Sequence, residues 1–152
     1  MSEPPSPPVT DLPNVRVETG VDTVSIGRIR GLVADEATGF VDRVFTTEER
    51  AYCDGTRHPA EHYAARWCVK EAARKLVDDP GRVAFRDVAT HRTETGAPRL
   101  AVADTARRAL TETVGAPPST AAVDTAISLT HDRESDTATA VVTVAVGGGG
   151  PS

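Results

Sequence analysis

The stretch AARWCVKEAARKL, residues 64–76, decides the fold of this chain. Four of its apolar side chains recur at spacings of four, three and four residues, the pattern of one buried helix face: Ala65, Val69, Ala72 and Leu76. A second row of side chains lies beside this stripe on the surface of the helix, and its last two members are Glu71 and Lys75. The sequence therefore predicts a helix from about Pro59 to about Val77, with Glu71 and Lys75 at the edge of its buried side.

Glu71 and Lys75 lie four residues apart, and this spacing has two readings. The ordinary one is an ion pair worth about 0.3–0.5 kcal/mol. The functional one is a carboxylate that binds a hard cation such as Mg²⁺, next to an ammonium that binds a phosphate. It requires a second carboxylate, and Asp22 in GVDTV is the candidate, because an acidic side chain among apolar strand residues is unfavourable without a partner. A solvated aspartate at a strand end is the alternative.

Length and composition indicate one domain with a thin core. A chain of 152 residues with 39% hydrophobic content is about the size of one domain. Aromatic residues make up only 4%, so small and β-branched side chains must form most of the core. We expect oligomerisation to stabilise such a core.

Charge and cysteine content exclude several classes of protein. The formal net charge of −5 argues against non-specific nucleic-acid binding, which favours a basic surface. Cys53 and Cys68 match no metal-binding spacing, so we expect two unpaired thiols. Neither a signal peptide nor a long apolar run precedes them, which predicts a cytoplasmic protein without a membrane partner.

The two ends of the chain differ from its middle. Residues 1–14 are rich in proline and polar residues, and residues 147–152 are mostly glycine. Neither end carries enough apolar side chains to fold, so we expect a disordered N-terminus and a flexible tail. The predicted domain covers residues 15–146.

The first half of the domain reads as a strand followed by helices. A strand within residues 15–26 is predicted to end near Asp22. A short helix follows, with Ser25 as its N-cap. Thr46 and Glu49 form a capping box that begins a second helix, and the long helix is the third.

The second half alternates between strands and a helix. Residues 82–93 and 98–103 read as strands on either side of a TGAP turn, and residues 104–115 as a helix closed by Gly115. Residues 121–132 and 137–146 read as an antiparallel hairpin. The predicted fold class is α+β, a single domain with a long central helix and helices on one face of a mostly antiparallel sheet.

A histidine and two hydroxyl groups lie close together near the end of one predicted strand. His131 ends the segment SLTH, and Ser128 and Thr130 precede it. Such a group can hold a phosphate, and His131 can equally be an ordinary turn residue. Both readings stay open.

Five segments, in order between about Val17 and Val144, resemble the short holo-acyl-carrier-protein synthases, a family of 4′-phosphopantetheinyl transferases. The most specific is ARWCVKEAARK, which is similar to the family motif Arg-Trp/Phe-x-x-Lys-Glu-Ala with a lysine four residues after the glutamate. The others are GVDTVSIGRI, FVDRVFTTEE, TGAPRL and ISLTHD. One such motif would be weak, whereas five in register are specific.

The resemblance implies the 4′-phosphopantetheinyl transferase fold and an Mg²⁺-dependent reaction. The 4′-phosphopantetheine arm of coenzyme A would move to a serine of an apo acyl carrier protein and leave 3′,5′-adenosine bisphosphate. Asp22 and Glu71 would bind Mg²⁺, and Lys75 would balance charge on the leaving phosphate. The base stays open between Glu71 and a metal-bound water that Glu71 orients.

The resemblance also assigns residues to the coenzyme A pocket. They are Arg66, Lys70, Lys75, Gly96, Pro98, Ser128, Thr130 and His131. Trp67 would pack at the base of the long helix. The family is typically a homotrimer with sites between two subunits, which suits the thin core.

The chain departs from the family at the surface that meets the carrier protein. Arg28 and Arg43 remain as expected contacts. Asp35 and Glu36, however, stand where relatives carry cations. Like charges would penalise a strongly acidic partner, which predicts a less acidic acceptor such as a polyketide carrier domain instead of the fatty-acid one.

A second departure concerns the turn of the pocket. Ala97 stands where many relatives carry a cation, and Arg99 is the candidate replacement. Two other classes of function stay open beside the transferase. One is a catalytically silent relative that binds a carrier protein or coenzyme A, and the other is an unrelated acidic binding module.

Overall fold

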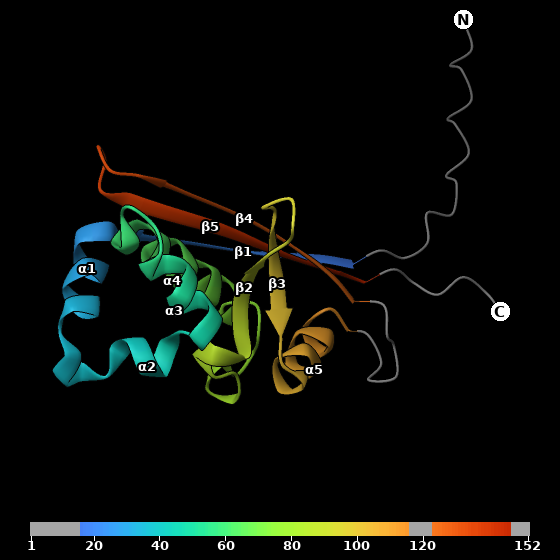
Figure 1. The fold of residues 1–152 in the computed structure, drawn as a ribbon. Helices are drawn as coiled ribbons and strands as arrows, with labels where there is room; N and C mark the ends of the chain where they lie inside the picture. The colour runs from blue at the N-terminus through green and yellow to red at the C-terminus, as the bar shows by residue number, and fades with distance from the viewer. Residues whose placement is uncertain (1–15, 116–122, 147–152) are drawn as a thin grey trace, which may run out of the picture.

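The computed structural model describes residues 16–115 and 123–146. The main sheet is antiparallel, with the order β1–β5–β4. Its strands are β1 (Arg16–Ser25), β4 (Val123–Asp132) and β5 (Thr137–Val146). A separate antiparallel hairpin pairs β2 (Val88–Arg92) with β3 (Pro98–Val102). Figure 1 shows the helices and this hairpin on one side of the main sheet, which confirms the predicted α+β class.

The described part of the chain has five α-helices, two of which begin at predicted caps. They are α1 (Ile26–Ala34), α2 (Phe40–Val44), α3 (Thr47–Asp54), α4 (Pro59–Arg74) and α5 (Asp104–Thr113), with short 3₁₀ turns η1 (Glu36–Thr38), η2 (Pro80–Arg82) and η3 (Phe85–Asp87). Oγ of Ser25 accepts the N–H of Arg28 at 3.1 Å, and Thr46 and Glu49 form the capping box. Gly115 follows α5 with a φ of 69°, a left-handed conformation that favours glycine.

Three predicted boundaries are wrong. Strand β1 continues three residues past Asp22, because its pairing with β5 extends to Ser25 opposite Thr137. The first half of the strand predicted over residues 82–93 forms η2 and η3 instead, where aspartate side chains accept nearby backbone N–H groups. Helix α4 ends at Arg74. The predictions for residues 1–14 and 147–152 lie outside the described residues.

Small side chains allow α4 to pack closely on the main sheet. The buried face of β5 is Ala138, Ala140, Val142, Val144 and Val146. The predicted stripe of α4 meets it, with Ala65, Val69 and Ala72 fully buried and Leu76 8% exposed. Gly20 of β1 lies so close to the helix that a Cβ there would collide with the carbonyl oxygen of Ala72. The glycine therefore sets how closely β1 crosses α4.

The other face of the main sheet is open. Val17 and Val21 are 54% and 52% exposed, unusually high for large apolar residues in a strand. Val21 lies in register with Val141 of β5, which in turn lies opposite Ser128 of β4. One face of the sheet thus covers the core, and the other presents valine, threonine and serine side chains.

Aromatic side chains gather around one side of α4. The indole of Trp67 stacks on Phe85 with ring centres 5.1 Å apart and meets Phe40 at 5.4 Å. Phe45 packs edge-on against Tyr63 at 4.8 Å. These contacts join α2, α4 and η3. No helix in the described part of the chain has both the length and the apolarity to cross a bilayer.

Replacing Gly20 with alanine should lower the free energy of unfolding by about 1–3 kcal/mol, because the added methyl group displaces β1 from α4. Urea unfolding followed by circular dichroism measures the change. Gly31→Ala is the matched control. Gly31 lies inside α1 with open space at its Cβ position, so this variant should gain roughly 0.5–1 kcal/mol. Equal stability of both variants would contradict the close-contact argument.

Candidate active site

Strand β1 brings Asp22 to the C-terminal end of α4. Asp22 lies on the same face of β1 as Gly20, the face that packs on the helix. Nζ of Lys75 is 2.9 Å from Oδ1 of Asp22 and donates a second hydrogen bond to the carbonyl oxygen of Val21 at 3.0 Å. Asp22 therefore lies beside the end of the long helix, and its expected role as the second carboxylate beside Glu71 stays a prediction.

Glu71 lies one helical turn before Lys75 but pairs with another cation. Its Oε1 is 3.6 Å from Nη1 of Arg74. The ordinary reading of Glu71 and Lys75 as an i,i+4 ion pair is therefore wrong in this structure, because Lys75 pairs with Asp22. The side chains of Asp22 and Glu71 are 16% and 29% exposed, so both are partly buried. We call the group of Asp22, Glu71 and Lys75 the rim.

The charges of Asp22 and Glu71 act on the ionisable groups beside them. Burial, together with the charge of Asp22, raises the pKa of the Cys68 thiol to about 12. The hydrogen bond to Asp22 raises the pKa of Lys75, and the charge of Glu71 adds to the effect. Cys68 is thus a neutral thiol, and Lys75 is firmly protonated at neutral pH.

The carboxylates of Asp22 and Glu71 are of the type that could hold a hard divalent cation. The described residues contain no group of three or more His, Cys, Asp or Glu side chains placed to hold a metal. Mg²⁺ needs few protein ligands, because it prefers oxygen and keeps waters or substrate phosphates. Asp22 and Glu71 carry carboxylate oxygens on a strand and a helix, a pair of ligands that would fit Mg²⁺ bound together with a phosphate group.

Lys70, predicted to contact coenzyme A, points into the core. Its side chain is fully buried, and Nζ donates to Oε1 of Glu49 at 2.7 Å, to the oxygen of Phe85 at 2.9 Å and to the oxygen of Val88 at 2.7 Å. Oε2 of Glu49 accepts the N–H of Thr90 at 3.2 Å. All three N–H groups of the ammonium are used. Lys70 therefore joins α3, α4 and β2 and is not part of the rim.

A cluster of positive side chains surrounds Tyr52. Arg66 is 1% exposed, and its guanidinium lies 4.1 Å from the centre of the Tyr52 ring, with that of Arg92 at 5.0 Å. Nε of both arginines is buried without a hydrogen-bond partner. Burial and the nearby positive groups lower the pKa of His62. The sequence argument missed Arg92, and the cluster has the properties of an anion site.

The three residues predicted to line the nucleotide side do not share a face. Ser128 and Thr130 lie on the open face of β4, whereas His131 lies on the face toward α4. Nδ1 of His131 is 3.2 Å from Oε2 of the buried Glu61, whose Oε1 is 2.8 Å from Nε of Arg133. A single pocket within one chain cannot include all three.

The TGAP turn has the expected form. Gly96 has a φ of 85°, which requires glycine, and Pro98 begins β3. Nη1 of Arg92 donates to the carbonyl oxygen of Gly96 at 2.7 Å, so the turn is tied to the arginine cluster. Arg99 is exposed and bonds only to the oxygen of Pro98. Arg92, and not Arg99, is therefore the cation on the inner side of this turn.

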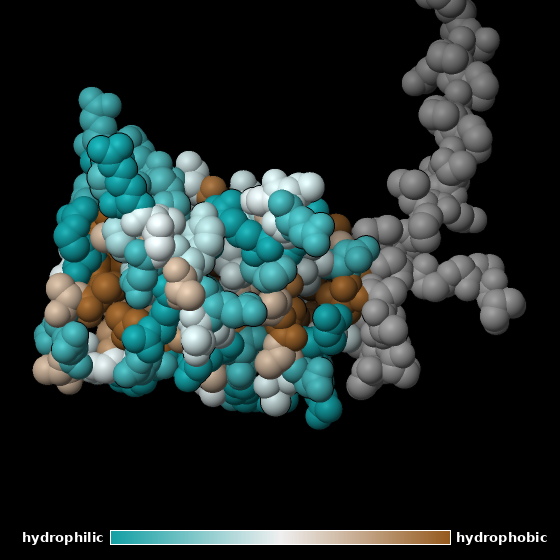
Figure 2. Space-filling view, viewed as in Figure 1, coloured by the Kyte–Doolittle hydropathy of each residue, from teal (hydrophilic) through white to brown (hydrophobic). Residues whose placement is uncertain are grey.

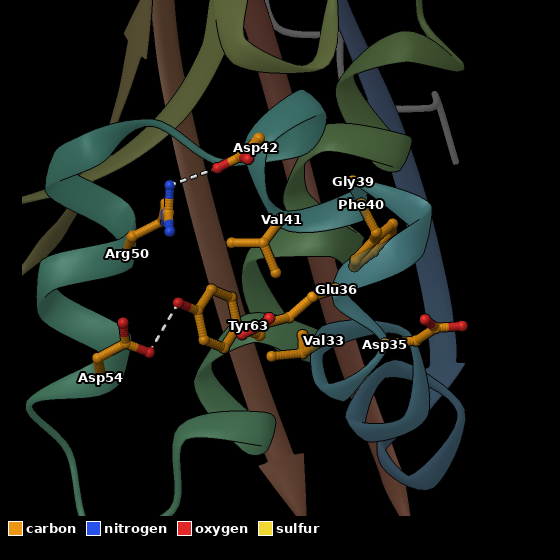
Figure 3. A pocket seen from close by; sticks show the side chains of 10 residues that line it. All are labelled: Val33, Asp35, Glu36, Gly39, Phe40, Val41, Asp42, Arg50, Asp54 and Tyr63. Atoms are coloured by element: carbon orange, nitrogen blue, oxygen red, sulfur yellow. Dashed lines mark hydrogen bonds and ion pairs between the residues drawn. The ribbon is translucent and has the colours of Figure 1, made fainter.

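A hollow of about 390 Å³ lies between α1, α2, α3 and α4. Figure 2 shows hydrophobic side chains in this region with hydrophilic ones around them. The apolar lining is Val33, Phe40, Val41 and Tyr63, and the charged lining is Asp35, Glu36, Asp42, Asp54 and Arg50. Figure 3 shows Arg50 facing Asp42, at 2.6 Å, and the Tyr63 hydroxyl donating to Asp54, at 2.8 Å. Arg28 and Arg43 are exposed on α1 and α2.

Comparison with known proteins identifies the family of this chain. The profile of the 4′-phosphopantetheinyl transferase superfamily matches residues 18–128, which is most of the chain. The chain belongs to this superfamily. The match includes Asp22, Glu71 and Lys75 and ends before Thr130 and His131.

Relatives within the superfamily are similar over most of their length. The holo-[acyl-carrier-protein] synthase of Gloeobacter violaceus is 34% identical over 125 residues, covering 81% of this chain and 89% of the relative. That of Anaeromyxobacter dehalogenans is 44% identical over 96 residues, covering 59% and 74%. The ACPS–CoA complex of Chronobacterium ammoniagenes has a TM-score of 0.68 at 27% identity and covers 86% of this chain and 97% of that one. The resemblance deduced from the five motifs is confirmed.

The buried position of Lys70 generates a prediction about stability. Lys70→Met should lower the free energy of unfolding by about 3–5 kcal/mol, because it leaves the Glu49 carboxylate buried without its cation. Lys75→Met, which removes a half-exposed lysine, should cost less than about 1 kcal/mol. Urea unfolding compares the two. The double variant Glu49→Gln with Lys70→Met should recover part of the loss, and no recovery would argue against a coupled pair.

Proposed function

We propose that this chain transfers the 4′-phosphopantetheine arm of coenzyme A to a serine of an apo acyl carrier protein. The observation that carries the proposal is that Lys75 pairs with Asp22 and also senses the charge of Glu71, in a chain of the 4′-phosphopantetheinyl transferase superfamily. The rim has the two carboxylates and the cation that transfer from a diphosphate requires.

The reaction exchanges one phosphorus–oxygen bond for another. The serine oxygen bonds to the β-phosphorus of coenzyme A, and the bond from this phosphorus to the bridging oxygen breaks. The bridging oxygen leaves with 3′,5′-adenosine bisphosphate and carries the new negative charge. The ammonium of Lys75, on the exposed side of the rim, would stabilise this charge. The serine proton goes to Glu71 or to a water that Glu71 orients.

Asp22 and Glu71 would hold Mg²⁺ in this proposal. The ion, when bound, would neutralise phosphate charge and act as a Lewis acid. The rigid strand and helix that carry the two carboxylates would keep their separation constant while substrates come and go. Orientation of reacting groups in this way removes much of the entropic barrier to transfer.

The nucleotide end of coenzyme A would lie toward the arginine cluster. Arg66 is buried and Arg92 is partly buried, the Nε atom of each is buried without a hydrogen-bond partner, and an anion would compensate their charge. Arg66 precedes Glu71 by five residues on the same helix, and Arg92 is bonded to the turn at Gly96. The anion would be a phosphate of the nucleotide, which agrees with the assignment of Gly96 and Pro98 to this side.

We further propose a homotrimer with active sites between subunits. The open face of the main sheet exposes the large apolar side chains of Val17 and Val21, which a second copy would cover. Ser128 and Thr130 lie on this same face. They would then line a site at the subunit boundary, although they cannot share a pocket with His131 inside one chain.

The acceptor would be a carrier with a weakly acidic docking surface. Arg28 and Arg43 offer cations, whereas four carboxylates surround the nearby hollow: Asp35, Glu36, Asp42 and Asp54. Arg50 neutralises only Asp42. A strongly acidic carrier would be repelled here, and a carrier domain with fewer acidic side chains would not.

Glu71→Gln should reduce transfer by at least about 100-fold, because the amide neither holds Mg²⁺ as a carboxylate does nor accepts a proton. Intact-protein mass spectrometry of an apo carrier, incubated with coenzyme A and Mg²⁺, measures the added arm. EDTA should abolish the gain. Glu112→Gln on the exposed face of α5 is the matched control and should transfer normally. Binding of coenzyme A by the unaltered chain without transfer to several carriers would favour a silent relative.

Replacing Asp35 and Glu36 with asparagine and glutamine should raise the rate with an acidic carrier by roughly three- to tenfold at low salt, because two repulsive charges are removed. The gain should shrink at high salt, where charges are screened. The control replaces Asp104 and Glu112 of α5, at the other end of the molecule (Figure 1), in the same way. If the unaltered chain modifies the more acidic of two carriers faster at low salt, the proposed carrier preference is wrong.

A further inference from the structure

Each carboxylate of the rim already has a cation of the chain beside it. Nζ of Lys75 is 2.9 Å from Oδ1 of Asp22, and Nη1 of Arg74 is 3.6 Å from Oε1 of Glu71. Two negative charges therefore face two positive charges. A divalent cation that approaches alone meets a nearly neutral rim and the repulsion of an ammonium.

The side chains of Arg74 and Lys75 differ in how firmly their other contacts hold them. Arg74 donates from Nη2 to the oxygen of Pro80 at 3.1 Å, and its guanidinium lies 4.0 Å from the centre of the Phe85 ring. Lys75 contacts only Asp22 and the oxygen of Val21, and its side chain is 53% exposed. Lys75 can therefore change partners without disturbing the core, whereas Arg74 cannot.

Asp22 itself is fixed. It lies within β1, in register with Ala140 of β5, and its side chain is only 16% exposed. Gly20, two residues earlier, holds the strand against α4. An exchange of partners at Asp22 must therefore come from movement of the Lys75 side chain.

We propose that Lys75 is an exchangeable counter-ion of Asp22 that makes a divalent cation and coenzyme A bind cooperatively. This inference rests on the proposed function. The diphosphate of coenzyme A brings negative charge to the rim and offers the ammonium a new partner. As Lys75 turns to the phosphate, Asp22 becomes available to the divalent cation. Each ligand then raises the affinity of the other by the same factor.

Mn²⁺ is the probe for this coupling, because electron paramagnetic resonance counts the free ion directly. The full chain is titrated with Mn²⁺, with and without saturating coenzyme A, and without carrier protein so that no transfer occurs. In the unaltered chain, coenzyme A should lower the Kd of Mn²⁺ by about tenfold or more. Lys75→Met should bind Mn²⁺ alone about tenfold more tightly and lose most of the coupling.

Two further variants separate charge from side-chain shape. Lys75→Arg keeps the cation and should keep the weak binding of Mn²⁺ alone. Arg108→Met removes an exposed cation from α5 and should leave both titrations unchanged. If Lys75→Met binds Mn²⁺ alone no more tightly than the unaltered chain, the counter-ion role is wrong.

The result for the unaltered chain distinguishes this inference from the proposed function. Equal Mn²⁺ affinity with and without coenzyme A, in a chain that binds coenzyme A and transfers its arm, would overturn the coupling and leave the transferase intact. Failure to bind coenzyme A at all, measured by isothermal titration calorimetry, would overturn both.

Discussion

The candidate site depends on the close crossing of β1 over α4. Gly20 has no side chain, so the strand lies against the carbonyl group of Ala72 at a separation that two ordinary side chains would prevent. Asp22, on the same face, is thereby brought to Lys75 at the end of the helix. The distance between the two sources of carboxylate is thus set by backbone packing. The contact between Gly20 and Ala72 brings the strand and the helix together, and Asp22 and Lys75 then form their ion pair.

The opposite side of the same helix is fixed by the buried ion pair of Glu49 and Lys70. Lys70 precedes Glu71 in sequence, yet one side chain lies in the core and the other at the rim. Three acceptors around the Lys70 ammonium allow only one rotation of α4 about its axis. We interpret this pair as an element that fixes the orientation of α4, because a rotation of the helix would leave two buried charges without their partners.

Several features that depend only on residues near in sequence were predicted correctly. The stripe and start of α4 and the caps at Ser25 and Thr46 follow from periodicity and side-chain chemistry, and the structure confirms them. The partner of Lys75 could not be predicted, because it depends on the register of a strand more than fifty residues away. The separation of His131 from Ser128 and Thr130 could have been, because side chains alternate along a strand. Arg92 belongs to none of the sequence motifs, and only its contacts with Tyr52 and Gly96 in the structure drew attention to it.

The packing of Trp67 has a practical consequence. It is the single tryptophan of the chain, and it lies one turn of α4 before Glu71, stacked on Phe85 and touching Phe40. Arg74, the partner of Glu71, lies over the other ring of that stack, Phe85. Fluorescence excited selectively at tryptophan therefore originates at one defined place, one helical turn from Glu71. We expect ligand binding at the rim to change the intrinsic fluorescence of Trp67, so that binding can be followed without an attached dye.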